Sequence, residues 1–222
     1  MKRLITLIAI SVCISAYAEK IKVKESKEDI GGGNNSALVI TLYGINPSDA
    51  EDEFKDFMKQ FDGKRSGKDG GVFIDNATIK QISGSNTIDV YGKALGKKGD
   101  PDILFVVAFD LDGTFLSSSE HVSQFKTAEK ITREFAVKVT KDVIAGELKT
   151  AQKTQRNLEN NQKDLERDNQ DLHNDIEKYK EKIKKAEADL VINQTNQTAK
   201  KLQIEAQKKL VTDIDAKLKA VE

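Results

Sequence analysis

The sequence predicts an α+β fold followed by a long α-helical coiled coil, and two observations lead to this prediction. All fourteen glycines and both prolines lie at or before Gly146. Apolar residues before Gly146 form short runs typical of strands, whereas those after it recur at heptad spacing. We therefore predict an α+β domain over residues 37–146 and a coiled coil over residues 147–222. With 38% hydrophobic and 32% charged residues, one core cannot run through the whole chain.

Residues 1–18, MKRLITLIAISVCISAYA, have the features of a cleaved secretory signal peptide. Lys2 and Arg3 precede a short apolar run, and a small-residue A-x-A motif ends at Ala18. The run is too short to span a bilayer core, which needs about 20 helical residues. A lipoprotein signal at Cys13 is disfavoured because the residue before it is not small. We therefore expect an exported protein that is periplasmic, associated with the outer envelope or secreted, with no transmembrane segment in its mature chain.

Removal of this segment would leave a chain without cysteine, because Cys13 is the single cysteine. Disulfides, thiolate nucleophiles and cysteine-ligated metals are then excluded. Loss of Lys2 and Arg3 from 36 basic residues leaves 34 against 36 acidic ones, a net charge of −2. Without a basic excess to neutralise phosphates, nucleic acid is not an expected partner. We expect no catalytic residues, no cofactor and no metal site.

Residues 19–36, EKIKVKESKEDIGGGNNS, are predicted to be a flexible N-terminal segment. Ile21 and Val23 alternate with charged residues, which allows a short edge strand. Three consecutive glycines and two asparagines then favour a loop.

The domain over residues 37–146 is predicted to be an antiparallel sheet with two helices on one face, a two-layer sandwich that resembles ferredoxin-like topologies. Pro47 and nearby acidic residues begin the first helix, and GKRSGKDGG is expected to be a loop. Strands are predicted at 37–44, 72–82, 87–94 and 103–109, and a short returning strand at 114–116. The first helix has an apolar face formed by Phe54, Phe57, Met58 and Phe61, and a second helix begins near Glu120.

Two segments come close to catalytic motifs. GKRSGKDGG lacks the spacing of a phosphate loop, because three residues separate Gly63 from Gly67 and Asp69 follows the lysine. ILFVVAFDLDGTFL, over residues 103–116, looks like the first motif of the haloacid-dehalogenase phosphatases. That resemblance implies Asp110 as nucleophile, Asp112 as acid/base and magnesium as cofactor. The competing interpretation is a strand followed by an Asp-Gly turn, which we favour because no further strands follow.

The heptad after Gly146 predicts the coiled coil. Its polar interruption NQTNQT, residues 193–198, consists of poor helix formers, and an apolar stripe resumes after it. We therefore predict a helical hairpin with its tip near 193–198; residues such as Ile176 and Ile214 would face each other. The alternative is one continuous helix in a parallel homodimer, in which Gln155, Gln162 and Asn169 would set the register.

The segments GGGNNSALVITLYG, VFIDNATIKQI and NTIDVYGKAL, with DLHNDI at Asp171–Ile176, resemble a family of secreted coiled-coil proteins of Gram-negative bacteria. Some members of that family are named for DNA-repair ATPases because their coiled coils look alike. The resemblance implies an exported protein whose activity is not established.

We expect a non-enzymatic interaction or scaffold protein that binds a protein partner, or itself, through the coiled coil. The alternatives are a periplasmic holdase-type chaperone and the magnesium-dependent phosphatase.

Overall fold

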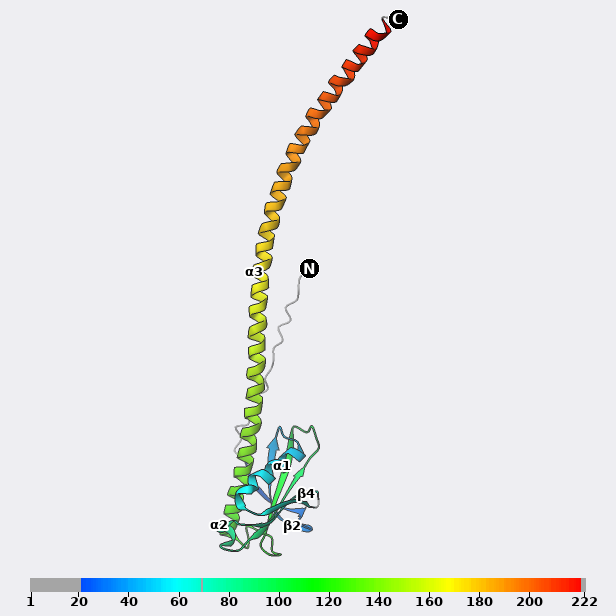
Figure 1. Cartoon of the computed structure of the whole chain (residues 1–222). Coiled ribbons are helices and arrows are strands. Elements are labelled where there is room, and N and C mark those ends of the chain that lie inside the picture. Colours follow the sequence, from blue (N-terminus) through cyan, green and yellow to red (C-terminus); the bar gives the residue numbers. More distant parts are fainter. Residues whose placement is uncertain (1–20, 69, 221–222) are drawn as a thin grey trace. The chain divides into compact units, whose positions relative to one another are not determined.

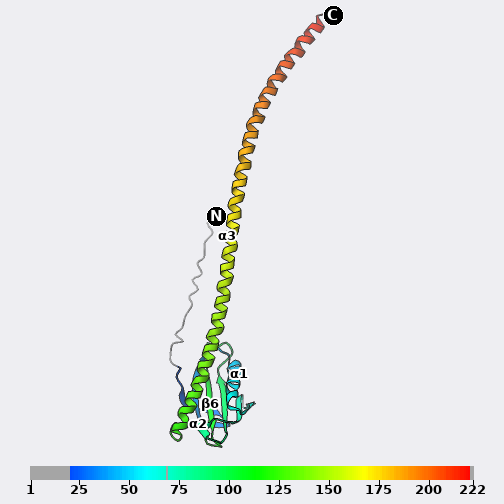
Figure 2. The same ribbon diagram turned by 60° about the vertical axis from the view of Figure 1, so that its left-hand side comes forward.

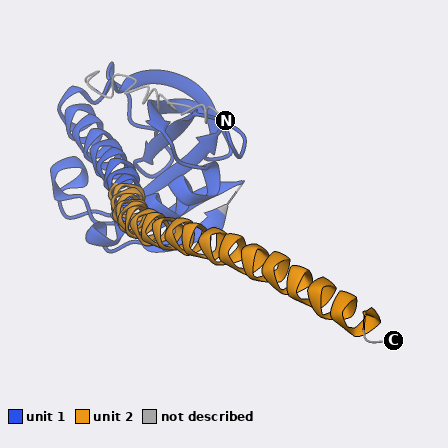
Figure 3. Cartoon of the chain, turned by 90° about the horizontal axis from the view of Figure 1, so that it is seen from above, with its two compact units in different colours: residues 1–151 blue, residues 152–222 orange. Residues whose placement is uncertain are grey.

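A computed structural model describes residues 21–68 and 70–220, so the predicted signal peptide lies outside the described residues. The chain divides into two compact units, which we call the sheet unit (residues 1–151) and the helical unit (residues 152–222) (Figure 3). Sequence composition placed the boundary near Gly146. The α+β class is confirmed by a six-stranded antiparallel sheet and a long helix.

The sheet has the strand order β1-β2-β6-β5-β4-β3, and every neighbouring pair is antiparallel. Figure 1 labels two of its strands, β2 and β4. The elements follow one another as β1 (Lys24–Ile30), β2 (Gly33–Tyr43), α1 (Pro47–Phe57), the 3₁₀ helix η1 (Met58–Phe61), β3 (Lys64–Lys68), β4 (Gly71–Ala77), α2 (Lys80–Ser83), β5 (Ile88–Leu95), β6 (Asp102–Asp110) and α3 (Val122–Lys219).

The main core lies between one face of the sheet and the helices that cover it (Figure 2). Alternation along β2 sends Leu38, Ile40 and Leu42 to this face, since successive side chains of a strand point to opposite sides. Phe135 of α3 lies at its centre, with its ring 5.0 Å from that of Phe54 and 5.1 Å from that of Phe105. The predicted apolar face of the first helix is thus confirmed as core, because Phe54 and Met58 are buried and Phe57 and Phe61 pack against them.

A second, smaller apolar cluster lies on the opposite face of the sheet. Tyr91 stacks near Phe73, with ring centroids 4.9 Å apart, and lies 6.0 Å from Phe115. The turn between β1 and β2 reaches this cluster, because a Cβ added to Gly31 would lie 2.5 Å from the Phe115 ring. The turn between the first two strands therefore helps to cover the face that the helices leave open.

Three predictions about the sheet unit differ from the structure, the first only in part. The edge strand that segment 19–36 allowed is present as β1, but the expected loop is reduced to a short turn, because residues 33–36 begin β2 and pair with β1. GKRSGKDGG, expected to be a loop, contains β3, because β4 offers a backbone partner that no local pattern reveals. The predicted strand 72–82 ends at Ala77, after a shift in register and a positive φ at Asn76, and α2 follows.

The ferredoxin-like topology is not confirmed, because β1 and β2 both precede α1 and the sheet has six strands.

The predicted helical hairpin is also absent from the structure, in which α3 continues through residues 193–198. This segment contains neither glycine nor proline. Its polar side chains bond within the helix: Thr195 and Thr198 donate to the carbonyls four residues earlier, and Gln197 donates to Asn193. The segment thus lacks the residues that break a helix most strongly, and its polar side chains find hydrogen-bonding partners without interrupting it.

Candidate interaction surface

The exposed apolar residues of α3 form the most extensive candidate site in the part of the chain that the structure describes. Most of them occupy a and d positions of a heptad and remain largely accessible; Leu165 is 64% exposed and Leu190 68% exposed. We call this set the α3 seam; within the helical unit it comprises Leu158, Leu165, Leu172, Ile176, Tyr179, Ile183, Leu190, Ile204, Val211, Ile214 and Leu218. Side chains at this spacing lie along one side of a helix.

The seam keeps one heptad register across the polar interruption. Leu190 and Ile204, both at position a, are separated by fourteen residues, which is two heptads. Val211 and Leu218 continue the a positions, and Ile214 occupies a d position. In the predicted hairpin, these C-terminal residues would belong to the second arm. The fourteen-residue spacing was the signal that would have joined them to the first half.

Apart from a few exposed apolar residues between Val191 and Leu210, the other sides of α3 are polar, and their ion pairs stabilise the helix locally. Ion pairs at three- or four-residue spacing include Arg167–Asp164, at 3.1 Å, and Lys208–Glu205, at 3.0 Å. Each such pair contributes only about 0.2–0.5 kcal/mol. The hydrophilic sides are therefore suited to water, whereas the seam is not.

Burial of the exposed seam by a partner would release a large amount of free energy. Burying one Leu or Ile side chain fully stabilises by about 1.5–3 kcal/mol. Single exposed apolar residues are ordinary on protein surfaces, but a contiguous series is typical of an interaction site.

The polar residues within the heptad have defined partners in the structure. Gln155 Nε2 donates to Glu159 Oε1 at 2.8 Å, and Gln162 Nε2 donates to Glu166 Oε1 at 2.9 Å. Both glutamines occupy a positions, and both glutamates occupy the flanking e positions. The a positions in the N-terminal part of the heptad are therefore polar, and their side chains bond to glutamates of the same helix.

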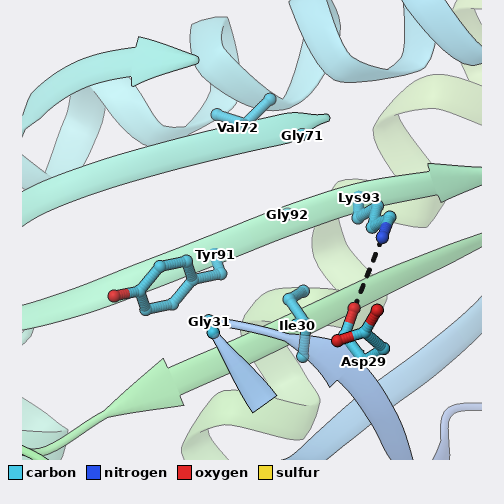
Figure 4. Close-up of a pocket in the computed structure, with 9 residues that line it drawn as sticks. Asp29, Ile30, Gly31, Gly71, Val72, Tyr91, Gly92 and Lys93 are labelled. Atoms are coloured by element: carbon cyan, nitrogen blue, oxygen red, sulfur yellow. Dashed lines mark hydrogen bonds between the residues drawn. The ribbon is translucent and has the colours of Figure 1, made fainter. Parts of the chain in front are cut away.

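The sheet unit has a small hollow of about 290 Å³ on the face of the sheet opposite the main core (Figure 4). Gly31, Gly71, Gly92 and Tyr91 contribute to its lining. Lys93 Nζ lies 3.4 Å from the backbone oxygen of Asp29 and bridges β5 to β1. The Lys93 ammonium group therefore already has a partner in the backbone of β1. We interpret the hollow as a consequence of the packing of the β1–β2 turn against β5.

The structure gives Asp110 and Asp112 structural positions in a turn. Asp112 and Gly113 have positive φ values of 63° and 91°, and Leu111 N–H donates to the Thr114 carbonyl at 2.9 Å. The Asp110 carboxylate accepts a hydrogen bond from the Gly113 amide at 2.6 Å. This is the predicted Asp-Gly turn. The entirely antiparallel sheet differs from the parallel sheet that the phosphatase resemblance implies.

Within residues 21–68 and 70–220, no group of three or more His, Cys, Asp or Glu side chains is arranged to hold a metal ion. In the same residues, no helix combines the length and apolar character required to cross a membrane.

Comparison with known proteins adds no relative. No protein-family model matches the chain. No curated protein and no solved structure matches it either.

Proposed function

We propose that this protein is an exported, non-enzymatic interaction or scaffold protein that presents α3 as a docking helix. The observation that carries the proposal is the α3 seam, whose apolar residues recur in one heptad register and are exposed to solvent. The features of residues 1–18 support export. Ion pairs on the other sides of the helix favour contact with water there, which leaves the seam as the surface available to a partner.

Site-specific photocrosslinking in cells tests this proposal. A benzophenone amino acid would replace Leu172, at a d position of the seam, or Asn174, two residues away at the outward f position. A discrete crosslinked protein band is expected from position 172 and not from position 174. Absence of a discrete band at position 172, or equal bands at both positions, would contradict the proposal.

A second candidate function, a holdase-type chaperone, is favoured by apolar residues outside the seam. Val191, Ile192, Leu202 and Leu210 are exposed at other heptad positions and widen the apolar surface. Such a surface fits unfolded clients with little sequence preference. Suppression of the heat-induced aggregation of an unrelated client protein would support this function, provided that replacing these four residues by Gln removes the suppression.

A further inference from the structure

We propose that the occupant of the α3 seam is a second copy of this chain, bound in parallel and in register as a two-stranded coiled coil. This inference rests on the proposed interaction function and specifies its partner. Three independent features of the helical unit support it: the shapes of the seam residues, the placement of one asparagine, and the signs of the charges that flank the seam.

Most of the apolar seam residues match the rule for parallel dimers, in which β-branched residues occupy a and Leu occupies d; Leu190 and Leu218, at a, and Ile214, at d, depart from it. The a positions include Ile176 and Ile183 and, beyond the interruption, Ile204 and Val211. The d positions of the first half are Leu158, Leu165 and Leu172, followed by Tyr179. Ile at both positions, or Leu at a with Ile at d, would favour three or four strands instead.

Asn169 occupies an a position one heptad before Ile176. A buried asparagine at a pairs with the same residue of the second helix and specifies register and two-stranded association. Such pairing is available only if the helices are parallel and in register. In that arrangement its amide has a hydrogen-bonding partner, whereas opposite an apolar residue it would be buried without one.

The flanking charges are complementary in the same arrangement. In a parallel dimer each g residue faces the e residue five positions later in the second helix. Asp175 then faces the second copy's Lys180, and Lys182 faces the second copy's Glu187. From Glu147–Gln152 to Leu210–Asp215, no such g–e pair brings like charges together.

An antiparallel arrangement is less favourable. If Ile176 packed against Tyr179 at the centre of an antiparallel pair, g residues would face g residues and e residues would face e residues. Asp175 would then face Lys182, but Asp168 would face Asp189 and Glu166 would face Glu187. The like-charge pairs are repulsive, and the parallel dimer avoids them.

Disulfide trapping of the full chain tests the arrangement directly. In a Cys13→Ser background, Leu172→Cys places one thiol on the seam, and Asn174→Cys places one on the outer surface as a matched control. In the parallel dimer the two position-172 side chains meet, so mild oxidation is expected to give a covalent dimer. The position-174 variant is expected to stay monomeric on a non-reducing gel. A lack of dimer at position 172, or equal dimer at both positions, would overturn the proposal.

Charge reversal provides a second test that does not disturb the apolar seam. Lys182→Glu and Glu187→Lys each create like-charge pairs, and each is expected to raise the dimer dissociation constant roughly threefold to tenfold. The double variant is expected to regain most of this loss. Residues five apart lie on different sides of one helix, so recovery requires contact between two helices. Sedimentation equilibrium measures the dimer dissociation constant of the wild type, the two single variants and the double variant.

The outcomes separate this inference from the proposed function. A monomeric wild type at tens of micromolar, or a double charge variant without recovery, would overturn self-association. If Leu172 nevertheless photocrosslinked to a different protein, the interaction function would stand with another partner. If position 172 gave neither a crosslink nor a disulfide dimer, both proposals would fail.

Discussion

Lys138 of α3 forms an ion pair with Glu53 of α1, with Nζ 2.5 Å from Oε2, and the same ammonium lies 2.9 Å from Asp142. Hydrogen bonds to these two carboxylates raise the pKa of Lys138 above its ordinary range, although burial opposes them. The pair joins the two helices that cover the main core, at the edge of the cluster around Phe135. It thereby holds the start of α3 in place over the sheet.

Replacing Lys138 by Met is expected to lower the free energy of unfolding of the sheet unit by less than about 1 kcal/mol, because the Lys138 and Glu53 side chains are 41% and 39% exposed and solvent screens the pair. A raised lysine pKa stabilises below the ordinary pKa, and this stabilisation is lost as pH rises through the raised value. The difference from wild type should therefore be complete at pH 7 and shrink above about pH 10. Urea unfolding followed by near-ultraviolet circular dichroism measures it; the exposed Lys141→Met is the control and should change little.

Gly31→Ala is expected to be more destabilising than Gly32→Ala. Both glycines have positive φ, 64° and 86°, so alanine costs about 1–2 kcal/mol at either position. Only at Gly31 does the added Cβ meet a ring, 2.5 Å from Phe115 Cζ, whereas Gly32 has open space. Overpacking should add about 1–3 kcal/mol to the first variant. Equal unfolding midpoints in urea would show that the Phe115 contact does not constrain this turn.

Glu25→Gln is expected to weaken the attachment of β1 to the segment that precedes α3. The Glu25 carboxylate accepts hydrogen bonds from the Ser118 amide at 3.0 Å, from the Ser118 hydroxyl, and from Ser36 Oγ at 2.9 Å. Burial acts to raise the pKa of Glu25, but these hydrogen bonds together outweigh it and lower the pKa. Loss of the charged acceptor should cost about 1 kcal/mol, reduced by solvent exposure.

The effect of Glu25 on stability depends on pH. A lowered carboxyl pKa stabilises above the ordinary value of 4.5, and this stabilisation disappears as pH falls through the lowered value. The difference between wild type and Glu25→Gln should be complete at pH 7 and vanish in strong acid. Glu28→Gln, also on β1, is the matched control; an identical pH dependence in both variants would refute a special role for Glu25.

Asp110→Asn is expected to leave the protein folded and without a change in phosphatase activity. Asparagine retains an acceptor for the Gly113 amide, whereas Asp110→Ala loses it and should cost about 1 kcal/mol. Hydrolysis of p-nitrophenyl phosphate with magnesium measures the activity. Magnesium-dependent hydrolysis by the wild type that the asparagine variant lacks would overturn the non-enzymatic assignment.

Much of the sheet unit was predictable because its signals are local. The apolar runs of β2 and β6 and the helical stripe that includes Ile131, Phe135 and Val139 identify these elements as parts of the core. The Asp-Gly turn after β6 was predictable for the same reason, since two adjacent residues determine it. The pattern that predicts each of these elements lies within a few consecutive residues.

The remaining strands depend on distant partners. The β3 residues KRSGK have no apolar alternation, and they form a strand because β4 lies beside them. Glycines in the turn after β1 suggested a loop, yet they allow the chain to pass close to Phe115 on the second face. In contrast, α3 continues through residues 193–198 despite their low helix propensity, and this segment contains neither glycine nor proline.

The α+β class, the change in composition near Gly146 and the heptad of the α3 seam are evident from the amino-acid sequence, because each follows from the spacing of nearby residues. The strand order, the six-stranded pairing and the unbroken course of α3 are evident from the structure alone. Strand pairing joins residues far apart in the chain, such as Leu42 and Ile103, and its free energy comes from backbone hydrogen bonds and burial that no local pattern contains.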